Sequence, residues 1–576
     1  MRVLFLHPDD NPECSPWAQQ SWDLAFDLGF AGQTAYNRWS ERLGCPITPV
    51  PRLGLEDFRH VRRALACGLG RVVDEYGLDW WELISIRFHE PIERILCLQE
   101  LQASLDSVLL DSDDEVWITR TGFHAQVLAL LFGNRNGVRC FSGNDSVPAK
   151  ARRAATTAWK FPTSQLLQIL GDKYDAGYRM RQWAAPRPRP STRPVVLLPT
   201  AYVNASRTAV AYASTVSDCD FLLVTTRQSG WIANPPANVS TARLASYASA
   251  KNREPEYQYL LNCWQDLQPL LSEDRELSIL KKLGSLDCAP MLREGLAIRD
   301  AWLRVFETEQ IISVLCADDS NPYTHIPLLI GRHFNFPAIA CHHGALDGRY
   351  LFKTSHADIV LAKNRMEEDY LVNTCGVPRK KVVVGAPASR VPEPIAKRKT
   401  SIVFFSEPYE IGGGRGEEFY REVLPRLAEI AAEGDYELVI KLHPIEIARE
   451  RKRLVKAVVA PDLAKLVRVV EGPLTEDLLQ QTSFAVTVLS TAALDCTRRG
   501  IPVFRCAWLD HSNYGYTKQF SQFAVGVALG CADEIAKVPS MLRGLAQNGP
   551  SDLWQTIEPD ELQQLLRGAL KLEAAV

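Results

Sequence analysis

A histidine–proline pair at the end of an apolar run is the feature of this sequence that points most directly to chemistry. The run Leu438–Leu442 is followed at once by His443 and Pro444. A continuous run of valine, isoleucine and leucine is typical of a strand buried on both faces of a parallel sheet. Pro444 cannot donate to a ladder, so the strand must end with His443 at its carboxyl edge. Ligands of open α/β sheets bind at that edge, and His443 is therefore a candidate for binding or protonating a phosphate.

The neighbours of His443 strengthen this interpretation. Lys441 adds a cation near the strand end, and Glu446 adds a carboxylate in the next loop. A departing phosphate needs its developing charge neutralised, and an imidazolium or a lysine can do so without a metal. The alternative is a histidine that only caps the following helix or is satisfied in a loop. The buried-strand context favours a donor-binding role for these three residues.

A second apolar strand, Ala485–Leu489, ends in two hydroxyl residues, Ser490 and Thr491. Both are predicted at the N-terminus of the next helix, where hydroxyls and free backbone N–H groups bind anions. Ordinary N-capping is the alternative. Because this strand follows the His443 strand in the same predicted sheet, the pair is a candidate for the same phosphate.

A glycine-rich stretch, Ser406–Arg415, follows the first strand of the last segment. Glycines such as Gly413 let the backbone approach a phosphate closely, and Arg415 could pair with its charge. The stretch is neither a Walker A sequence nor GxGxxG, so a flexible loop is an equal alternative.

Two adjacent histidines, His342 and His343, follow a buried strand in the middle of the chain. Histidine can take a proton from a hydroxyl near neutral pH, so His343 is a candidate base, with Asp347 as a carboxylate alternative. Arg349 lies close by in sequence. A structural histidine pair in a glycine-rich turn is the other interpretation. No third ligand has a recognisable spacing, so no metal site is predicted here.

Four further residues are candidates for the acceptor side. Asp318 and Asp319 follow another predicted strand and compete with His343 for the role of base. Asn204 and Arg207 follow the strand that opens the middle segment and could bind acceptor or donor. Structural loop roles are an equal alternative for all four.

The elements that must position these residues form an alternating pattern of strands and amphipathic stretches. Helix-period spacing is clearest in 417–433, with Phe419, Val423, Leu427 and Ile430 on one face. Such alternation predicts right-handed βαβ units and parallel sheets, an α/β fold class. The predicted strands are Val3–Leu6, Leu83–Ile86, Val116–Thr119, Arg139–Phe141, Val195–Pro199, Phe221–Thr225, Ile311–Cys316, Ala338–Cys341, Ile359–Ala362, Val382–Val384, Ile402–Phe405, Leu438–Leu442, Val467–Val470, Ala485–Leu489 and Pro502–Arg505.

Two linker-like stretches divide the sequence. Ala184–Pro194 is proline-rich and cationic, and Ala388–Lys399 is a weaker second one. They predict an incomplete N-terminal α/β segment over 1–183, an acceptor or partner module, followed by two doubly wound domains over 195–390 and 400–576.

Composition narrows the class of protein. The chain has 576 residues, 46% hydrophobic and 23% charged, which is typical of a globular protein of several domains. A net charge of -3 gives no argument for a nucleic-acid partner or an anionic membrane. No apolar run approaches the roughly 20 residues that cross a bilayer, so membrane association would be peripheral, through partners. The 14 cysteines include no Cys-x-x-Cys pair, which favours reduced thiols and a cytoplasmic location.

Taken together, the residues from about 310 to 510 resemble GT-B glycosyltransferases that carry a His-Pro motif. This group includes capsule Kdo transferases, bacterial polysialyltransferases and CDP-glycerol glycerophosphotransferases. The matching stretches are His343-Gly344, 357–362, Gly376-Val-Pro, Val384-Gly-Ala-Pro, Lys441-Leu-His-Pro444, Val488-Leu-Ser-Thr491 and Gly500-Ile-Pro-Val503.

The resemblance implies a GT-B arrangement, with the middle domain on the acceptor side and the last domain on the nucleotide-sugar side. It assigns donor-phosphate contacts to His443, Ser490 and Thr491, and an acceptor-side role to His343. The glycerophosphotransferases have Trp-His-Gly where this chain has His342-His-Gly, and Asp-Tyr-Ser-Ser where it has Val-Leu-Ser-Thr. These departures favour a CMP-sugar. The acidic motif of polysialyltransferases has a loose counterpart around Asp347.

The leading hypothesis is therefore an inverting, metal-independent glycosyltransferase without a cofactor. It would move a sugar from a nucleotide-sugar to a carbohydrate or lipid-linked acceptor in bacterial surface polysaccharide synthesis, a setting implied by the resemblance alone. One alternative is a sugar-nucleotide 2-epimerase, which would convert the donor without an acceptor. Another is a non-catalytic nucleotide-binding or scaffold protein that retains the fold.

Overall fold

The structure, a computed structural model, describes most of the chain. The described residues are 1–13, 16–106, 114–132, 138–140, 193–249, 251–317, 321–344, 357–387, 400–544 and 553–568. Four of the predicted site residues, Asp318, Asp319, Asp347 and Arg349, lie outside them, as does the stretch Ala388–Lys399.

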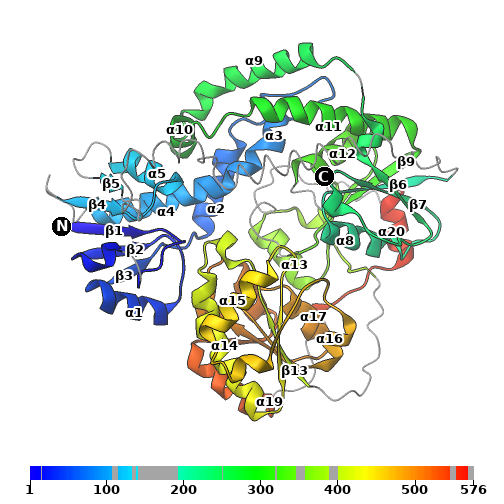
Figure 1. The fold of residues 1–576 in the computed structure, drawn as a ribbon. Helices are drawn as coiled ribbons and strands as arrows, with labels where there is room; N and C mark the ends of the chain where they lie inside the picture. Colours follow the sequence, from blue (N-terminus) through cyan, green and yellow to red (C-terminus); the bar gives the residue numbers. More distant parts are fainter. Residues whose placement is uncertain are drawn as a thin grey trace. The chain divides into compact units, whose positions relative to one another are not determined.

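Three parallel sheets carry the fold (Figure 1), and the predicted α/β class is confirmed. Each sheet has the same strand order: its first strand in sequence is internal, the next two continue to one side, and the later strands lie on the other. This is the doubly wound pattern of Rossmann-like sheets. The point where the strand order reverses lies between β1 and β4, between β6 and β9, and between β13 and β16. Loops that leave these strand ends are the natural places for a ligand.

The first sheet is formed by the N-terminal part of the chain. Its strands, in spatial order, are β3 (Ile47–Pro49), β2 (Leu24–Asp27), β1 (Arg2–Leu6), β4 (Glu115–Ile118) and β5 (Val138–Cys140). The helices of this part of the chain are α1 (Gln33–Leu43), α2 (Leu55–Ala66), α3 (Trp80–Ser85), α4 (His89–Asp106) and α5 (Phe123–Phe132).

The middle sheet has seven strands among the described residues. In spatial order they are β12 (Val382–Val384), β11 (Ile359–Ala362), β10 (Ala338–Cys341), β9 (Ile311–Cys316), β6 (Val195–Thr200), β7 (Asp220–Thr225) and β8 (Val239–Arg243). The helices of this part are α8 (Val203–Ala213), α9 (Glu254–Leu271), α10 (Arg275–Lys282), α11 (Ala289–Thr308), α12 (Pro322–His333) and α13 (Arg365–Asp369). The helix α20 (Pro559–Leu566) packs into the core of this sheet through Leu562 and Leu565, together with Ile557 just before it.

The last sheet has six strands in the part of the chain that the structure describes. In spatial order they are β15 (Val467–Val470), β14 (Glu437–Lys441), β13 (Ser401–Phe405), β16 (Thr482–Thr487), β17 (Val503–Cys506) and β18 (Val527–Leu529). Its helices are α14 (Gly416–Glu433), α15 (Ala448–Val458), α16 (Glu476–Gln481), α17 (Ala492–Arg498), α18 (Tyr516–Gln522) and α19 (Val538–Leu542). The apolar face predicted for α14, including Phe419, Val423 and Leu427, is buried against the sheet.

One predicted strand is wrong. Leu83–Ile86 is apolar enough to suggest a strand, but Leu83 lies in α3, a short helix buried on several sides, and Ile86 begins a 3-10 turn directly after it. Asp79 caps this helix, and its side chain accepts hydrogen bonds from the backbone N–H groups of Trp81 and Glu82. Periodicity cannot separate a short buried helix from a buried strand, which explains the error.

The chain forms two compact units that do not follow the three predicted segments. The first unit comprises Met1–Leu55, Arg94–Asp145 and Val391–Ser551, and therefore holds both the first and the last sheet. The second unit comprises Glu56–Glu93, Ser146–Arg390 and Asp552–Val576, and holds the middle sheet. The N-terminal part of the chain is thus shared between the units, and the C-terminal residues belong with the middle sheet.

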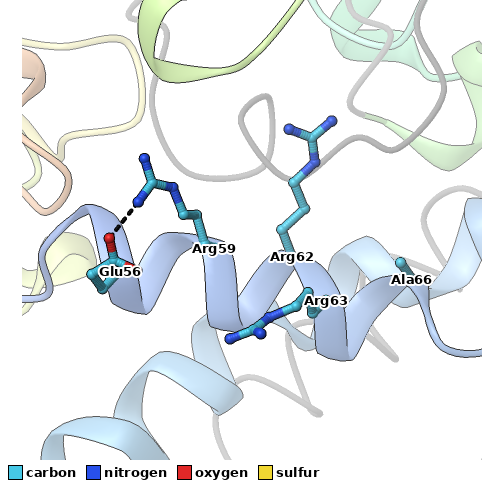
Figure 2. A pocket seen from close by; sticks show the side chains of 5 residues that line it. All are labelled: Glu56, Arg59, Arg62, Arg63 and Ala66. Carbon is cyan, nitrogen blue, oxygen red and sulfur yellow. Dashed lines mark hydrogen bonds and ion pairs between the residues drawn. The ribbon is translucent and has the colours of Figure 1, made fainter.

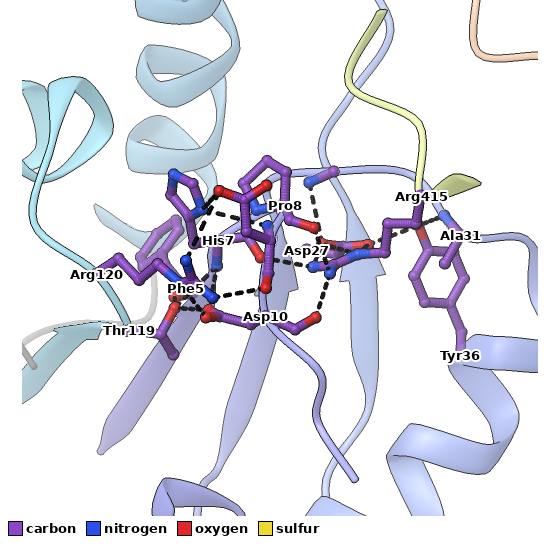
Figure 3. Close-up of polar contacts among 12 residues, drawn as sticks. Phe5, His7, Pro8, Asp10, Asp27, Ala31, Tyr36, Thr119, Arg120 and Arg415 are labelled. Carbon is purple, nitrogen blue, oxygen red and sulfur yellow. Dashed lines mark hydrogen bonds and ion pairs between the residues drawn. The ribbon is translucent and has the colours of Figure 1, made fainter. Parts of the chain in front are cut away.

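A buried arginine, Arg415, joins the first and last sheets within the first unit (Figure 3). Its Nη2 donates to Asp27 Oδ1 at 2.6 Å, and Nε lies 3.1 Å from Oδ2 of the same carboxylate. The guanidinium also donates to the backbone carbonyls of His7 (2.8 Å), Pro8 (2.7 Å) and Asp10 (2.5 Å). Although burial opposes the charge, Asp27 raises the pKa of Arg415. A charge this deeply buried is tolerated because these acceptors surround it.

Backbone pairing reinforces this junction. Phe30 donates to the carbonyl of Gly413 at 2.9 Å, and its own carbonyl accepts from the N–H of Arg415 at 2.7 Å. Arg38 of α1 forms a 2.7 Å ion pair with Glu418 of α14. The first sheet is therefore built onto the last sheet through backbone and side-chain contacts.

A second buried arginine plays the same part in the second unit. Arg299 of α11 has no exposed side-chain surface, and it pairs with Asp74 at 2.8 Å and with Asp300 at 2.6 Å. It also bonds Glu256 of α9. These contacts fasten the segment Glu56–Glu93 to the helices of the middle sheet.

Among the described residues, no helix is both long and apolar enough to cross a bilayer. The cysteines in the same part of the chain are free thiols, and most of them are buried.

Replacing Arg415 by methionine should lower the free energy of unfolding of the first unit by about 3–5 kcal/mol, because Asp27 would be left buried without a partner. Urea unfolding of the two proteins measures this difference. Arg426→Met is the matched control, since Arg426 pairs with an Asp533 side chain that is 82% exposed. The control should cost less than about 1 kcal/mol. Equal losses in the two variants would contradict the structural role of Arg415.

Candidate functional site

The carboxyl ends of three adjacent strands form the candidate donor site in the last sheet. β13 lies between β14 and β16, so the loop after Phe405 is flanked by the His443 turn and by Ser490 and Thr491. Neighbouring strands are about 4.8 Å apart, which puts the ends of β14 and β16 roughly 10 Å from each other. This spacing suits a phosphate-bearing group held between them.

His443 sits in an exposed turn whose backbone is fixed by its own neighbours. Its N–H donates to Glu446 Oε2 at 2.7 Å, and its Nδ1 accepts from the N–H of Ile445 at 3.4 Å. Since Nδ1 is the acceptor, the neutral ring carries its proton on Nε2. Within the described part of the chain Nε2 has no hydrogen-bond partner, so this N–H is available to a ligand.

The pKa of His443 is lowered from its ordinary value of 6.5. Partial burial of the ring is the main cause, Glu446 opposes it, and Lys441 adds to it. At neutral pH the free protein therefore holds a neutral imidazole here. An anionic ligand beside Nε2 would raise the pKa again and draw in a proton.

Glu446, predicted to bind the donor, has a structural role instead. Its side chain is fully buried, and Oε1 accepts from the hydroxyl of Ser406 at 2.6 Å and from Nε of Arg451 at 2.7 Å. Arg451 in turn pairs with Glu410 at 2.7 Å. The carboxylate thus fastens the His443 turn to the loop after β13 and has no free oxygen for a ligand.

Lys441 is likewise committed to the protein. Its side chain is buried, and Nζ donates to the carbonyls of Leu442 at 2.8 Å and Gly472 at 2.7 Å. Burial lowers its pKa, and Glu446 raises it. The ammonium thus joins the ends of β14 and β15 through two of its three N–H groups, and its predicted role in donor binding stays a prediction.

Arg415 and Gly413 also have structural contacts, with residues of the N-terminal part of the chain. Arg415, predicted to bind a phosphate, instead bonds Asp27 and three backbone carbonyls of the loop after β1. Gly413 has φ +82°, a conformation that favours glycine, and its carbonyl accepts from Phe30. The glycine-rich loop therefore binds the first sheet in this structure.

Ser490 and Thr491 remain available. Ser490 is half-buried, its N–H donates to Thr487 Oγ1 at 3.0 Å, and its Oγ accepts from the N–H of Ala492 at 3.3 Å. This leaves the hydroxyl proton of Ser490 free to donate. Thr491 is the residue before α17, and its side chain makes no capping hydrogen bond. Both hydroxyls can therefore serve a ligand at the end of β16.

The middle sheet carries a second polar arrangement, around His343. Its Nδ1 lies 3.1 Å from the carbonyl of Ala317, and its Nε2 lies 2.9 Å from the hydroxyl of Tyr202. The two rings meet edge to face, with centroids 4.8 Å apart. If Nδ1 donates to the carbonyl, Nε2 is the basic nitrogen and accepts the phenol proton. A carbonyl that orients an imidazole in this way is the usual support of a histidine base.

These three residues come from neighbouring strand ends, because β6, β9 and β10 are adjacent. Tyr202 follows β6, Ala317 follows β9, and His343 follows β10. They therefore mark the point where the strand order of this sheet reverses.

No contact among the described residues tests the predicted acceptor-side roles of Asn204 and Arg207. Asn204 and Arg207 lie in the first turns of α8, with Arg207 exposed, and neither bonds His343 among the residues described. His342 is buried, and its Nδ1 lies 2.9 Å from the carbonyl of Gly344, which supports a structural role in the turn.

A separate cavity of about 480 Å³ opens beside α2 in the second unit. Its described lining is Glu56, Arg59, Arg62, Arg63 and Ala66 (Figure 2). Arg59 pairs with Glu56, and Arg62 donates to the carbonyl of Cys375 at 2.8 Å. None of these described lining residues is a predicted site residue.

No protein-family model matches this sequence, and neither does any curated protein. Among solved structures, similar chains include a protein assigned as a UDP-N-acetylglucosamine 2-epimerase from Listeria monocytogenes, at 10% identity and TM-score 0.44, covering 66% of this chain and 97% of that one. Another is the UDP-GlcNAc 2-epimerase of Neisseria meningitidis bound to UDP-GlcNAc, at 12% identity and TM-score 0.38, covering 66% and 98%. A third is a glycosyltransferase from Rickettsia africae, at 10% identity and TM-score 0.34, covering 65% and 94%. At these values the similarity carries no argument about activity, and the fold class follows from the sheets themselves.

The imidazole of His443 should titrate with a midpoint below 6.5 in the free protein, because burial and Lys441 disfavour the cation. Nuclear magnetic resonance of selectively labelled histidine, assigned with a His443→Gln variant, measures this midpoint. A midpoint above 6.5 would contradict the proposed neutral state.

Proposed function

We propose that this protein is an inverting, metal-independent glycosyltransferase that moves a sugar from a nucleotide-sugar to a carbohydrate acceptor. One observation carries the proposal. At the end of β14 and β16, beside the point where the last sheet reverses its strand order, Nε2 of His443 and the hydroxyls of Ser490 and Thr491 are left without internal hydrogen-bond acceptors in the described residues. The charged side chains of Glu446 and Arg415 at the same edge already form hydrogen bonds and ion pairs within the protein.

The donor's phosphate would be bound at this edge by neutral donors. His443 supplies its Nε2–H, and the two hydroxyls supply O–H groups from the opposite side of β13. As the bond between the anomeric carbon and the phosphate oxygen breaks, its electron pair goes to the phosphate. The growing negative charge strengthens all three hydrogen bonds and favours proton uptake by His443, which is the differential stabilisation that catalysis needs.

The acceptor hydroxyl would be activated by His343. Its Nε2 takes the proton as the acceptor oxygen forms its bond to the anomeric carbon from the opposite face, which inverts the configuration. The carbonyl of Ala317 holds Nδ1–H and stabilises the imidazolium that results. Tyr202 occupies Nε2 in the free protein, so the acceptor hydroxyl would displace its phenol. Asp318, Asp319 and Asp347 remain alternative bases.

A CMP-sugar and a role in bacterial surface polysaccharide synthesis are the finer parts of the proposal. They rest on the resemblance to transferases with a His-Pro motif. An epimerase of nucleotide-sugars is the second candidate, and its distinguishing property is that it needs no acceptor.

His443→Gln should lose at least about a hundredfold in turnover, because glutamine keeps an N–H donor but cannot take up the proton that charges His443 as the phosphate leaves. His333→Gln is the control, since His333 is an exposed histidine outside the site. Transfer assays with CMP-, UDP- and GDP-sugars, with and without acceptor, measure both variants. Wild-type turnover in a correctly folded His443→Gln protein would overturn the mechanism. Conversion of the donor alone would identify an epimerase.

The free nucleotides CMP, CDP, UDP and GDP should separate the donor classes. A nucleotide that binds only the native state stabilises it, by about 2.7 kcal/mol at a concentration of a hundred times its Kd. We expect the largest rise in thermal midpoint with CMP or CDP, and a smaller rise in Ser490→Ala/Thr491→Val. A response to UDP alone would contradict the cytidine assignment, and no response to any nucleotide would favour a scaffold protein.

A further inference from the structure

Three metal-ligating side chains converge in the second unit, away from the residues of the proposed transfer reaction. His60 belongs to α2, Asp274 is the N-cap of α10, and Glu276 lies in the first turn of α10. A ring nitrogen of His60 and one oxygen from each carboxylate all lie within 4.8 Å of one another. Side chains from two segments separated by more than two hundred residues thus present one nitrogen and two oxygens to a common point.

The contacts within the cluster leave room for an ion. His60 Nε2 lies 2.8 Å from Glu276 Oε2. Asp274 uses Oδ1 to accept the backbone N–H groups of Glu276 at 3.1 Å and Leu277 at 3.0 Å, and its carboxyl group also interacts with the side chain of Glu276. Tetrahedral bonds of 2.0–2.2 Å would need ligand atoms roughly 3.4 Å apart, so only small side-chain shifts are required.

The charges in the cluster are not balanced by the protein. Glu276 is 2% exposed, and in the part of the chain that is described His60 is the one basic side chain that pairs with either carboxylate. Buried carboxylates are normally paired or coordinate metals, and a divalent cation would balance this group.

We propose that His60, Asp274 and Glu276 bind a divalent transition-metal ion, with Zn²⁺ the best fit. Imidazole nitrogen with carboxylate oxygen is a common ligand set of Zn²⁺, whereas Mg²⁺ and Ca²⁺ prefer oxygen alone. The side chain of His60 is 40% exposed, which gives the ion a route from solvent and leaves a position for water.

Such an ion would connect α2 to α10, and so fasten the segment Glu56–Glu93 to the helices beside the middle sheet. Its role is to stabilise the second unit, independently of the proposed transferase activity. Arg299 holds the same segment further along the chain through Asp74.

Isothermal titration calorimetry of the untagged, chelator-treated chain with ZnCl₂ tests the proposal, together with the thermal midpoint. We expect the wild type to bind one Zn²⁺ per chain at this site and to show a higher thermal midpoint when Zn²⁺ is bound. Asp274→Asn and Glu276→Gln should each lower the affinity for Zn²⁺ at least tenfold and reduce the rise in thermal midpoint. Asp274→Asn is the sharper variant, because asparagine keeps the N-cap oxygen and removes the charge. His333→Gln, which changes an exposed histidine elsewhere in this unit, should bind Zn²⁺ like the wild type.

Failure of the wild type to bind stoichiometric Zn²⁺ would overturn the proposal. Unchanged affinity in a folded Asp274→Asn protein would overturn it as well. Circular dichroism of each variant confirms folding, and because nucleotide binding is measured separately, failure of the metal site leaves the transferase proposal standing.

Discussion

The buried pair of Arg415 and Asp27 is the interaction on which the first unit depends. Two Rossmann-like sheets, distant in sequence, share this unit, and the guanidinium sits between them with carbonyls of the first sheet around it. A buried arginine of this kind is stable only with all its partners present. The contacts of Arg415 therefore join the first sheet to the last sheet. They also fix the conformation of the loop after β13, which carries Arg415.

The same principle decides which polar residues are available for chemistry. Lys441, Glu446 and Arg415 are charged residues at a ligand-binding edge, and each is satisfied by the protein itself. What remains is an imidazole and two hydroxyls. In the proposed mechanism, such a site would bind phosphate through hydrogen bonds and gain positive charge only when His443 takes up a proton. Charge would then appear at the moment when the leaving phosphate needs it.

Much of the fold could be predicted from the sequence, because strands buried on both faces leave continuous apolar runs. β9, β10, β11, β12 and β15 have the predicted bounds, and most others differ by one to three residues. The short strands β2, β3, β8 and β18 have no comparable apolar run, and the apolar run Leu83–Ile86 predicts a strand where the structure has the end of α3. The roles of individual polar side chains are harder to predict from the sequence, because their partners are distant along the chain. The partner of Arg415 lies 388 residues away, and that of His343 lies 141 residues away, at Tyr202. The available signal for Tyr202 is a tyrosine three residues beyond the predicted strand Val195–Pro199, and such a signal is not distinctive.

The central claim is that the imidazole of His443 meets the donor's phosphate. Calorimetry of cytidine nucleotide binding near pH 7, in two buffers with different ionisation enthalpies, tests it most directly. The account predicts uptake of a fraction of a proton by the wild type and none by His443→Gln. Binding heats that do not depend on the buffer, or proton uptake that persists in the variant, would contradict it.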